Sequence, residues 1–151
     1  MTRSINDAGL AIIKKDEGLQ LRAYRDVAGI PTIGYGHTPA TMGDTISVQE
    51  ANALLIGDVT HACQAVDGST HDVPTTDNQF SAMVSLTFNI GVGAFRSSSL
   101  LRLHRASAYA AAANAFLSWD KTHVNGVLKI EPGLLRRRTE ESTLYLLGVP
   151  T

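Results

Sequence analysis

Residues 16–38 have the sequence DEGLQLRAYRDVAGIPTIGYGHT, which differs in character from the sequence on either side. Tyr, Ile, Thr and Gly are frequent in it, and apolar and polar residues alternate with a period of two until Ala28-Gly29 and Pro31 interrupt the pattern. Alternation of this kind, broken by turn residues, is typical of antiparallel strands. The stretch therefore predicts a short β-hairpin, with a third strand expected near residues 43–46.

Helices are expected on both sides of this hairpin. Apolar residues recur at helical spacing near the N-terminus and predict a helix over residues 5–16. After the hairpin, Ser47 and Glu50 have the spacing of a capping box. They predict a helix over residues 47–66, which is long enough to connect two lobes.

The sequence from Thr76 onward is predicted to be helical almost to its end. The last helix is predicted to start at Pro132, because proline is favoured at the first helical position, and to stop at Gly148. Asn125-Gly126 marks a tight turn, and a second small hairpin is expected there. The predicted fold class is therefore α+β, a small antiparallel sheet attached to a mostly helical body.

The composition limits the class of protein. A chain of 151 residues with 44% hydrophobic and 18% charged residues suits one globular domain. Its formal charge of −1 provides no overall basic field, so nucleic acid is not expected as a partner. No stretch approaches the roughly 20 apolar residues of a membrane span, and the first residues lack the apolar core of a secretory signal. We therefore expect a protein made in a cytoplasm, without stable membrane insertion.

Glu17 falls at the C-terminal end of the first predicted helix. The helix dipole there disfavours a carboxylate anion and so favours the protonated form that a general acid requires. The neighbouring cations Lys14, Lys15 and Arg22 act in the opposite direction. Glu before Gly is also common at helix ends, so the position alone leaves a catalytic and a structural interpretation open.

Asp26 ends the first predicted strand. If it lies opposite Thr32, Tyr24 faces Gly34, and one face of the sheet carries a carboxylate beside a hydroxyl. Such a pair can hold a water molecule, while Gly34 and Gly36 leave room for a ligand. With a protonated acid across the gap, these groups can hydrolyse a glycosidic bond. An Asp near a turn is equally ordinary turn chemistry.

Residues 16–38 also resemble the N-terminal signature of a known family, the tailed-phage lysozymes of glycoside hydrolase family 24. The family pattern is Glu-Gly-Leu, then Tyr-x-Asp at the end of a strand, then Thr-Ile-Gly-x-Gly-His, and each part is present. FNIGVGAFRSSSLL at 88–101 resembles the family's Phe-Asn-x-Gly segment, and Trp119 with GLLRRRTEESTLYL at 133–146 resembles its final helix. The resemblance covers nearly the whole chain in the expected order.

The resemblance implies a lysozyme-like fold. Residues 1–151 would form a single domain, with a small β-containing lobe at about 17–60 joined by a long helix to a helical lobe of about 61–151 plus the N-terminal helix. It also implies an endolysin that hydrolyses the β-1,4 bond between N-acetylmuramic acid and N-acetylglucosamine of bacterial peptidoglycan. Such an enzyme uses no cofactor, and it lyses the host cell to release phage.

Three residues carry the reaction that the resemblance implies. Glu17 would protonate the leaving glycosidic oxygen. Asp26 would act as base, or electrostatic partner, for a water attacking from the opposite face, and Thr32 would help to orient that water. Inversion is expected, so the carboxyl groups of Glu17 and Asp26 should lie roughly 6.5–9.5 Å apart.

Three further candidates lie in the hairpin region. His37 is expected to fix the hairpin through hydrogen bonds rather than to act in catalysis. The five histidines of the chain show no metal-ligand spacing, so no metal is expected. Tyr24 and Tyr35 would either line the cleft or simply pack.

Other candidates lie in the helical body. The resemblance implies that Phe88, Asn89 and the serines at 97–99, Ser98 among them, border the sugar-binding cleft. An Asn89 amide can pair with an acetamido group. The structural alternatives are that Phe88 belongs to the core and that Ser98 caps a helix.

Arg137 and Arg138 belong to the basic run RRR near the C-terminus. A basic face on an exposed helix is usually solvated, and Glu140 and Glu141 lie within pairing distance on the same helix. The resemblance implies instead that one of the two arginines contacts Glu17, without indicating which.

Three other functions compete with hydrolysis. A lytic transglycosylase cuts the same bond with one carboxylic acid, a wall-binding module binds without turnover, and the basic C-terminal helix alone would disrupt membranes. The presence of Asp26 and Thr32 beside Glu17 favours hydrolysis. An endolysin without an export signal is expected as a monomer in the host cytoplasm, dependent on a holin for release to the periplasm.

Overall fold

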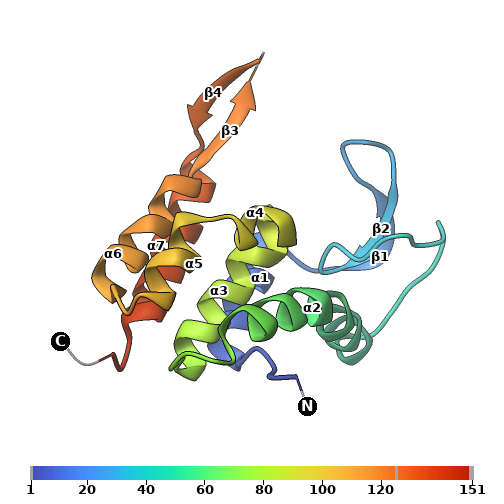
Figure 1. The fold of residues 1–151 in the computed structure, drawn as a ribbon. Coiled ribbons are helices and arrows are strands. Elements are labelled where there is room, and N and C mark those ends of the chain that lie inside the picture. Colours follow the sequence, from blue (N-terminus) through green and yellow to red (C-terminus); the bar gives the residue numbers. More distant parts are fainter. Residues whose placement is uncertain (1, 125, 150–151) are drawn as a thin grey trace. The chain divides into compact units, whose positions relative to one another are not determined.

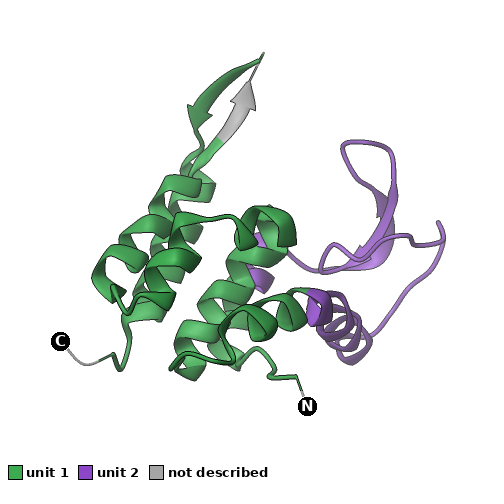
Figure 2. Ribbon diagram, in the orientation of Figure 1, with its two compact units in different colours: residues 1–12, 62–151 green, residues 13–61 purple. Residues whose placement is uncertain are grey.

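The computed structural model describes residues 2–124 and 126–149, apart from the side chains of 122–124 (Figure 1). The chain divides into two compact units (Figure 2). Residues 13–61 form the hairpin unit, and residues 1–12 with 62–151 form the helical unit. Helices dominate and two small antiparallel sheets accompany them, which confirms the predicted α+β class.

A two-stranded sheet lies at the centre of the hairpin unit. Strand β1 spans Gln20–Arg25 and pairs with β2, Pro31–Gly34, in antiparallel orientation, as predicted. The third strand expected near residues 43–46 is reduced to an isolated bridge between Arg22 and Thr45.

The predicted register of this hairpin is wrong by two residues. Thr32 lies opposite Tyr24, and Asp26 instead closes a turn by donating its N–H to the carbonyl of Ile30. The Asp26 carboxylate accepts hydrogen bonds from the N–H groups of Ala28 and Ile30, which stabilises a shorter turn than the predicted register requires. A shift of two residues preserves the alternation of faces, so Thr32 still shares its face with Tyr24.

The core of the hairpin unit lies where the sheet meets the end of α1 and the start of α2. Helix α1 spans Asp7–Glu17, within two residues of the prediction. A Cβ on Gly34 would lie 3.3 Å from Ile46 Cδ1 and 3.4 Å from Ala51 Cβ. The backbone of Gly34 is thus packed in the core, and the expectation that it leaves room for a ligand is wrong. Buried apolar residues of this unit are Ile13, Ala23, Ile33, Ala51, Leu55 and Val59.

Helix α2, Val48–Thr70, starts at the predicted capping box. The Ser47 hydroxyl accepts from the N–H of Glu50 at 3.0 Å, and the Glu50 carboxylate accepts from the N–H of Ser47 at 3.1 Å. The helix continues past its predicted end at residue 66, because one exposed glycine, Gly68, costs only about 1 kcal/mol in a helix.

Helix α3, Asp77–Ile90, forms the centre of the helical unit and is buried from Gln79 to Thr87. A capping box between Thr76 and Gln79 fixes its start. Shorter helices follow it, namely α4 (Val92–Arg96), α5 (Ser99–Arg105), α6 (Tyr109–Ala115) and the 3-10 helix η1 (Phe116–Trp119).

Helix α7, Pro132–Leu146, packs against α3, α6 and η1. It starts at the predicted proline, and the Glu131 carboxylate caps it by accepting two backbone hydrogen bonds. Strands β3 (Lys121–Val124) and β4 (Val127–Ile130) precede it and confirm the second predicted hairpin. Asn125 of the predicted turn lies outside the described residues.

Candidate active site

Glu17 is the last residue of α1, and its side chain is exposed. The helix ends there because Gly18 adopts a left-handed conformation, with φ 71°, and donates its N–H to the Lys14 carbonyl at 2.9 Å. The Glu17 carboxylate lies against the loop after β2, since a Cβ on Gly36 would come within 2.7 Å of Glu17 Oε2. Glycine at position 36 therefore makes the space that this carboxylate occupies.

Asp26 and Thr32 are connected through the backbone of Ile30. The Ile30 carbonyl accepts the N–H of Asp26 at 3.0 Å and the hydroxyl of Thr32 at 2.9 Å. The Ile30 N–H in turn donates to Asp26 Oδ1 at 2.9 Å. Thr32 is buried, with 3% of its surface exposed, and Asp26 is half-buried. The turn thus holds a carboxylate and a hydroxyl in a fixed relation.

His37 anchors the hairpin to α2. Its ring Nδ1 contacts the two carboxylate oxygens of Asp58 at 3.0 and 2.9 Å, and its backbone exchanges two hydrogen bonds with Ile33. These are the hydrogen bonds expected of a residue that fixes the hairpin. Among the described residues, no cluster of three or more His, Cys, Asp or Glu side chains is arranged to hold a metal ion.

Tyr24 and Tyr35 are both half-buried members of the hairpin unit. Tyr24 is paired with Thr32 across the strands. The ring of Tyr35 lies below the Lys14 ammonium, 5.5 Å from its centroid, which is within the range of a cation–π contact. Six predicted site residues therefore belong to the hairpin unit: Glu17, Tyr24, Asp26, Thr32, Tyr35 and His37.

The remaining predicted site residues belong to the helical unit. Ser98 is buried and caps α5, since its hydroxyl accepts from the N–H of Leu101 at 3.1 Å and donates to the Phe95 carbonyl at 2.7 Å. Phe88 is half-buried and Asn89 is exposed, both in the last turn of α3.

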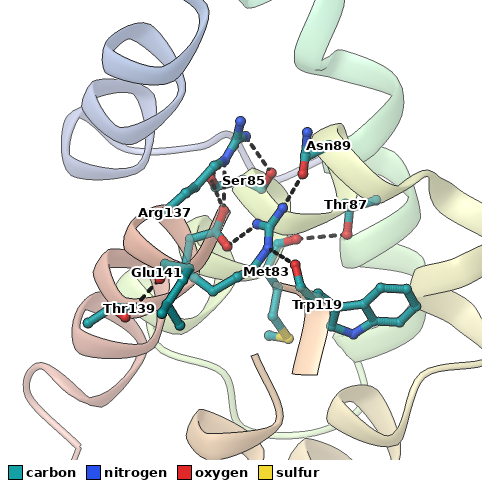
Figure 3. Close-up of polar contacts among 10 residues, drawn as sticks. Met83, Ser85, Thr87, Asn89, Trp119, Arg137, Thr139 and Glu141 are labelled. Carbon is teal, nitrogen blue, oxygen red and sulfur yellow. Dashed lines mark hydrogen bonds and ion pairs between the residues drawn. The ribbon is translucent and has the colours of Figure 1, made fainter. Parts of the chain in front are cut away.

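Arg137 and Arg138 do not form a solvated basic face, and that expectation is wrong. Their exposed fractions are 2% and 0%, and that of Glu141 is 0%. Glu141 accepts from Arg137 Nε at 3.2 Å and from Arg138 Nη1, and Ser85 donates its hydroxyl to the same carboxylate (Figure 3). Packing of α7 against α3 encloses these side chains, so their charges are satisfied internally rather than by water.

Arg138 connects three segments of the helical unit. Its Nε donates to the Trp119 carbonyl at 3.0 Å, its Nη1 to Glu141 and its Nη2 to the side-chain oxygen of Asn89 (Figure 3). A buried side chain on α7 thereby fixes an exposed amide on α3. The hydrogen bond between Arg138 and Asn89 joins two residues that are predicted separately as site candidates.

Two partners in these networks are absent from the sequence prediction. Asp58 is 21 residues from His37, and its helical position carries no signal of the contact. Ser85 lies within the apolar run AMVSLTF of α3, and a polar residue in such a run is the one signal that indicates a buried hydrogen bond.

Comparison with known proteins agrees with these observations. Residues 14–141 match the model of the phage lysozyme family. An endolysin of Acyrthosiphon pisum secondary endosymbiont phage 1 is 42% identical over 142 residues, which are 93% of this chain and 97% of that protein.

Two solved structures extend the match to the fold. The endolysin of Escherichia coli O157:H7 phage FAHEc1 has a TM-score of 0.89 and 40% identity, covering 99% of this chain and 98% of its own. A variant of the lysozyme of phage P22 has a TM-score of 0.84 and 39% identity, covering 95% and 99% of the two chains. The sequence signature, the fold and these matches together place the chain in the phage lysozyme family.

Proposed function

We propose that Glu17, Asp26 and Thr32 hydrolyse the β-1,4 bond between N-acetylmuramic acid and N-acetylglucosamine in one displacement, with inversion at the anomeric carbon. As a phage lysozyme, the chain is a peptidoglycan-degrading glycosidase, and the proposal adds the residues and the steps. Its main support is the turn that ties Asp26 to Thr32 through Ile30.

The attacking water is assigned to Asp26 and Thr32. Asp26 Oδ1 is occupied by two turn hydrogen bonds, whereas Oδ2 has no partner among the described residues. The Thr32 hydroxyl hydrogen is engaged by the Ile30 carbonyl, which leaves the oxygen as an acceptor. In the proposed step, a water donates one hydrogen bond to Thr32 and transfers its other proton to Asp26 while its oxygen bonds to the anomeric carbon.

Glu17 is assigned as the acid. Its exposed position at the end of α1, over Gly36, leaves the carboxyl accessible to a polymer. Its proton passes to the leaving glycosidic oxygen as the carbon–oxygen bond breaks. Glu17 is then anionic and Asp26 protonated, and exchange with bulk water restores both. The roughly 6.5–9.5 Å separation of the two carboxyl groups stays a prediction of this mechanism.

The stereochemistry of the product tests the proposal. Proton NMR of a digestion followed from the first seconds should show the α-anomer before mutarotation, and a β-anomer would overturn inversion. Asp26→Asn and Thr32→Val should lower kcat, because each removes part of the water site. The control is Asp44→Asn, an exposed carboxylate of the same unit whose side chain makes no hydrogen bond among the described residues. Full activity of Asp26→Asn would refute its assignment.

A lytic transglycosylase is the alternative reaction on the same bond. It needs a single acid and forms an anhydro sugar, so it gives no role to the Asp26–Thr32 turn. Mass spectrometry of digested peptidoglycan distinguishes the two reactions, since hydrolysis adds one water and leaves a reducing end.

The setting of the reaction is also a proposal. We assign the chain to the host cytoplasm as a monomer that reaches the wall after a holin opens the membrane. No helix among the described residues has the length and apolar character to cross a membrane. Cells that express the chain alone should lyse only after chloroform treatment, and sedimentation should give a 16.1 kDa species. Lysis without permeabilisation would exclude holin dependence.

A further inference from the structure

A pocket of about 430 Å³ lies in the helical unit, where α4 ends and α5 begins. We infer that it binds the phosphate group of a small phosphomonoester, such as a sugar phosphate, through the side chains of Arg96 and Arg102. Its volume is within the range of small-molecule sites. The inference does not rest on the proposed hydrolysis, because Glu17, Asp26 and Thr32 all belong to the other unit.

Three arginines line this pocket, and no acidic side chain of the described residues lines it. Arg96 is the last residue of α4. Ser99, Arg102 and Arg105 follow at intervals of three residues on α5, so their side chains share one face of that helix. A chain with a formal charge of −1 thus concentrates positive charge in one concavity, which attracts anions.

The charge of Arg105 is already compensated within the protein. Its guanidinium donates to the two carboxylate oxygens of Asp72 at 2.7 and 2.9 Å and to the Ser69 carbonyl at 2.8 Å. The hydrogen bonds from Arg105 lower the pKa of Asp72 to about 2, so this carboxylate stays charged at neutral pH. Arg105 is therefore held in place as one wall of the pocket.

Arg96 and Arg102 leave two positive charges uncompensated. Both are exposed, and neither has a hydrogen bond or ion pair with any residue that the structure describes. Their combined charge matches the roughly −1.5 to −2 of a phosphomonoester at pH 7, whereas a single carboxylate would balance only one of them. The Ser99 hydroxyl also lacks a hydrogen bond among these residues, so it can donate to a further phosphate oxygen.

The rest of the lining favours a phosphate carried on an organic body. The pocket is larger than a free phosphate ion needs, and Leu101 adds an apolar surface beside the arginines. The Ser97 hydroxyl donates to the Gly93 carbonyl at 3.1 Å, so its oxygen is available to accept from a hydroxyl group. A sugar phosphate combines these features, namely a dianion, a partly apolar ring and hydroxyl donors.

The first test compares ligands by calorimetry at constant ionic strength. Glucose 1-phosphate should bind more tightly than inorganic phosphate, and glucose and acetate should not bind measurably. Acetate binding equal to that of the phosphates would show a general attraction of anions and would overturn the inference. Equal binding of glucose 1-phosphate and inorganic phosphate would assign the pocket to the free ion and overturn the sugar phosphate.

The second test substitutes the arginines. Arg96→Gln and Arg102→Gln should each weaken binding of glucose 1-phosphate about tenfold or more, as expected for loss of a charge-assisted hydrogen bond, and Ser99→Ala should weaken it less. The melting temperature should not fall, because these side chains have no partner to lose among the described residues. The control is Arg136→Gln, an equally exposed arginine on α7 without a hydrogen bond or ion pair among those residues. An equal loss in Arg136→Gln would refute the site.

Competition separates this pocket from the proposed active site. With Glu17→Gln saturated with glucose 1-phosphate, addition of the N-acetylglucosamine tetramer should leave the phosphate bound. Displacement would make the pocket part of the substrate site and would overturn the inference. A short DNA duplex should bind more weakly than glucose 1-phosphate. Tighter binding of the duplex that is lost in Arg102→Gln would assign the pocket to nucleic acid and would also overturn it.

Discussion

Two carboxylates of the hairpin unit and one carboxylate of the helical unit lie in opposite environments. Glu17 is exposed at a helix end and Asp26 is half-buried in a turn, whereas Glu141 is enclosed between two arginines with none of its surface exposed. The first two retain access to water. The third is fully satisfied by protein, so its contribution is to hold α7 and α3 together.

The difference in exposure separates two roles within one chain: exposed carboxyl groups are available for reaction, and buried ones stabilise the fold. An accessible carboxyl group is available for proton transfer but contributes little to folding, because water solvates it in the unfolded chain as well. A buried ion pair contributes chiefly through the cost of breaking it, since removal of one partner leaves an uncompensated charge in the interior. Substitutions in the two units should therefore affect different measurements.

Glu17→Gln should give the largest effect on activity. Loss of the proposed acid is expected to lower kcat by about 10²–10⁴-fold. The melting temperature should stay equal or rise, because active sites often store destabilising contacts. Turbidity of chloroform-treated Gram-negative cells and thermal unfolding measure the two properties. Full lysis would refute the assignment of Glu17 as the acid. A melting temperature lowered as far as in a Glu141 variant would show that Glu17 stabilises the fold.

Glu141→Gln should give the largest effect on stability. The substitution leaves the buried guanidinium groups of Arg137 and Arg138 without their shared carboxylate, at an expected cost of about 3–5 kcal/mol in the free energy of unfolding. Urea unfolding measures this cost. The control is Glu140→Gln, one position earlier on the same helix and half-buried, which should cost below about 1 kcal/mol. Equal losses at the two positions would contradict the assignment.

His104 should make the stability of the helical unit depend on pH. It is buried, with its ring nitrogens on Tyr145 Oη at 2.6 Å and Thr75 Oγ1 at 2.9 Å. Burial, and secondarily the charge of Arg105, lower the pKa of His104 from 6.5 to about 4.

The sign of this dependence follows from proton binding. Between pH 6.5 and about 4 the unfolded chain binds a proton that the folded chain excludes, so the stability present above pH 6.5 is lost as the pH falls, by about 3 kcal/mol in all. Urea unfolding at several pH values measures the slope. His104→Gln should flatten the slope, and His61→Gln, an exposed position on α2, should not. Identical slopes in the two variants would exclude His104 as the cause.

Asp58→Asn should give the smallest effect. The pair of Asp58 and His37 is about three-quarters buried, with side-chain exposures of 29% and 25%, so its loss should cost about 1 kcal/mol. Exchange of the backbone amides that join Ile33 and His37 should quicken more than exchange in α3, because the contact holds the hairpin. Asp67→Asn, farther along the same helix, is the control, and equal exchange in the two variants would show that Asp58 does not support the hairpin.

Local features of the fold were predictable because neighbouring residues decide them. The capping boxes at Ser47 and Thr76 and the proline at the start of α7 act within one helical turn. The hairpin register was not predictable from alternation, because Asp26 closes the turn with its side chain. The role of Gly36 was equally hidden, since the atom it accommodates belongs to Glu17 on another element.

The sequence by itself determined the fold class, the helix boundaries to within a few residues and the candidate carboxylates, because periodicity, caps and a short signature are all local. Only the tertiary structure decided that Arg137 and Arg138 are buried and that Arg138 meets Asn89, 49 residues away. A run of charged residues normally stays in water. Packing of α7 on α3 reverses that preference here, because it brings Glu141, Ser85 and Asn89 together as hydrogen-bond partners that no short window of sequence contains.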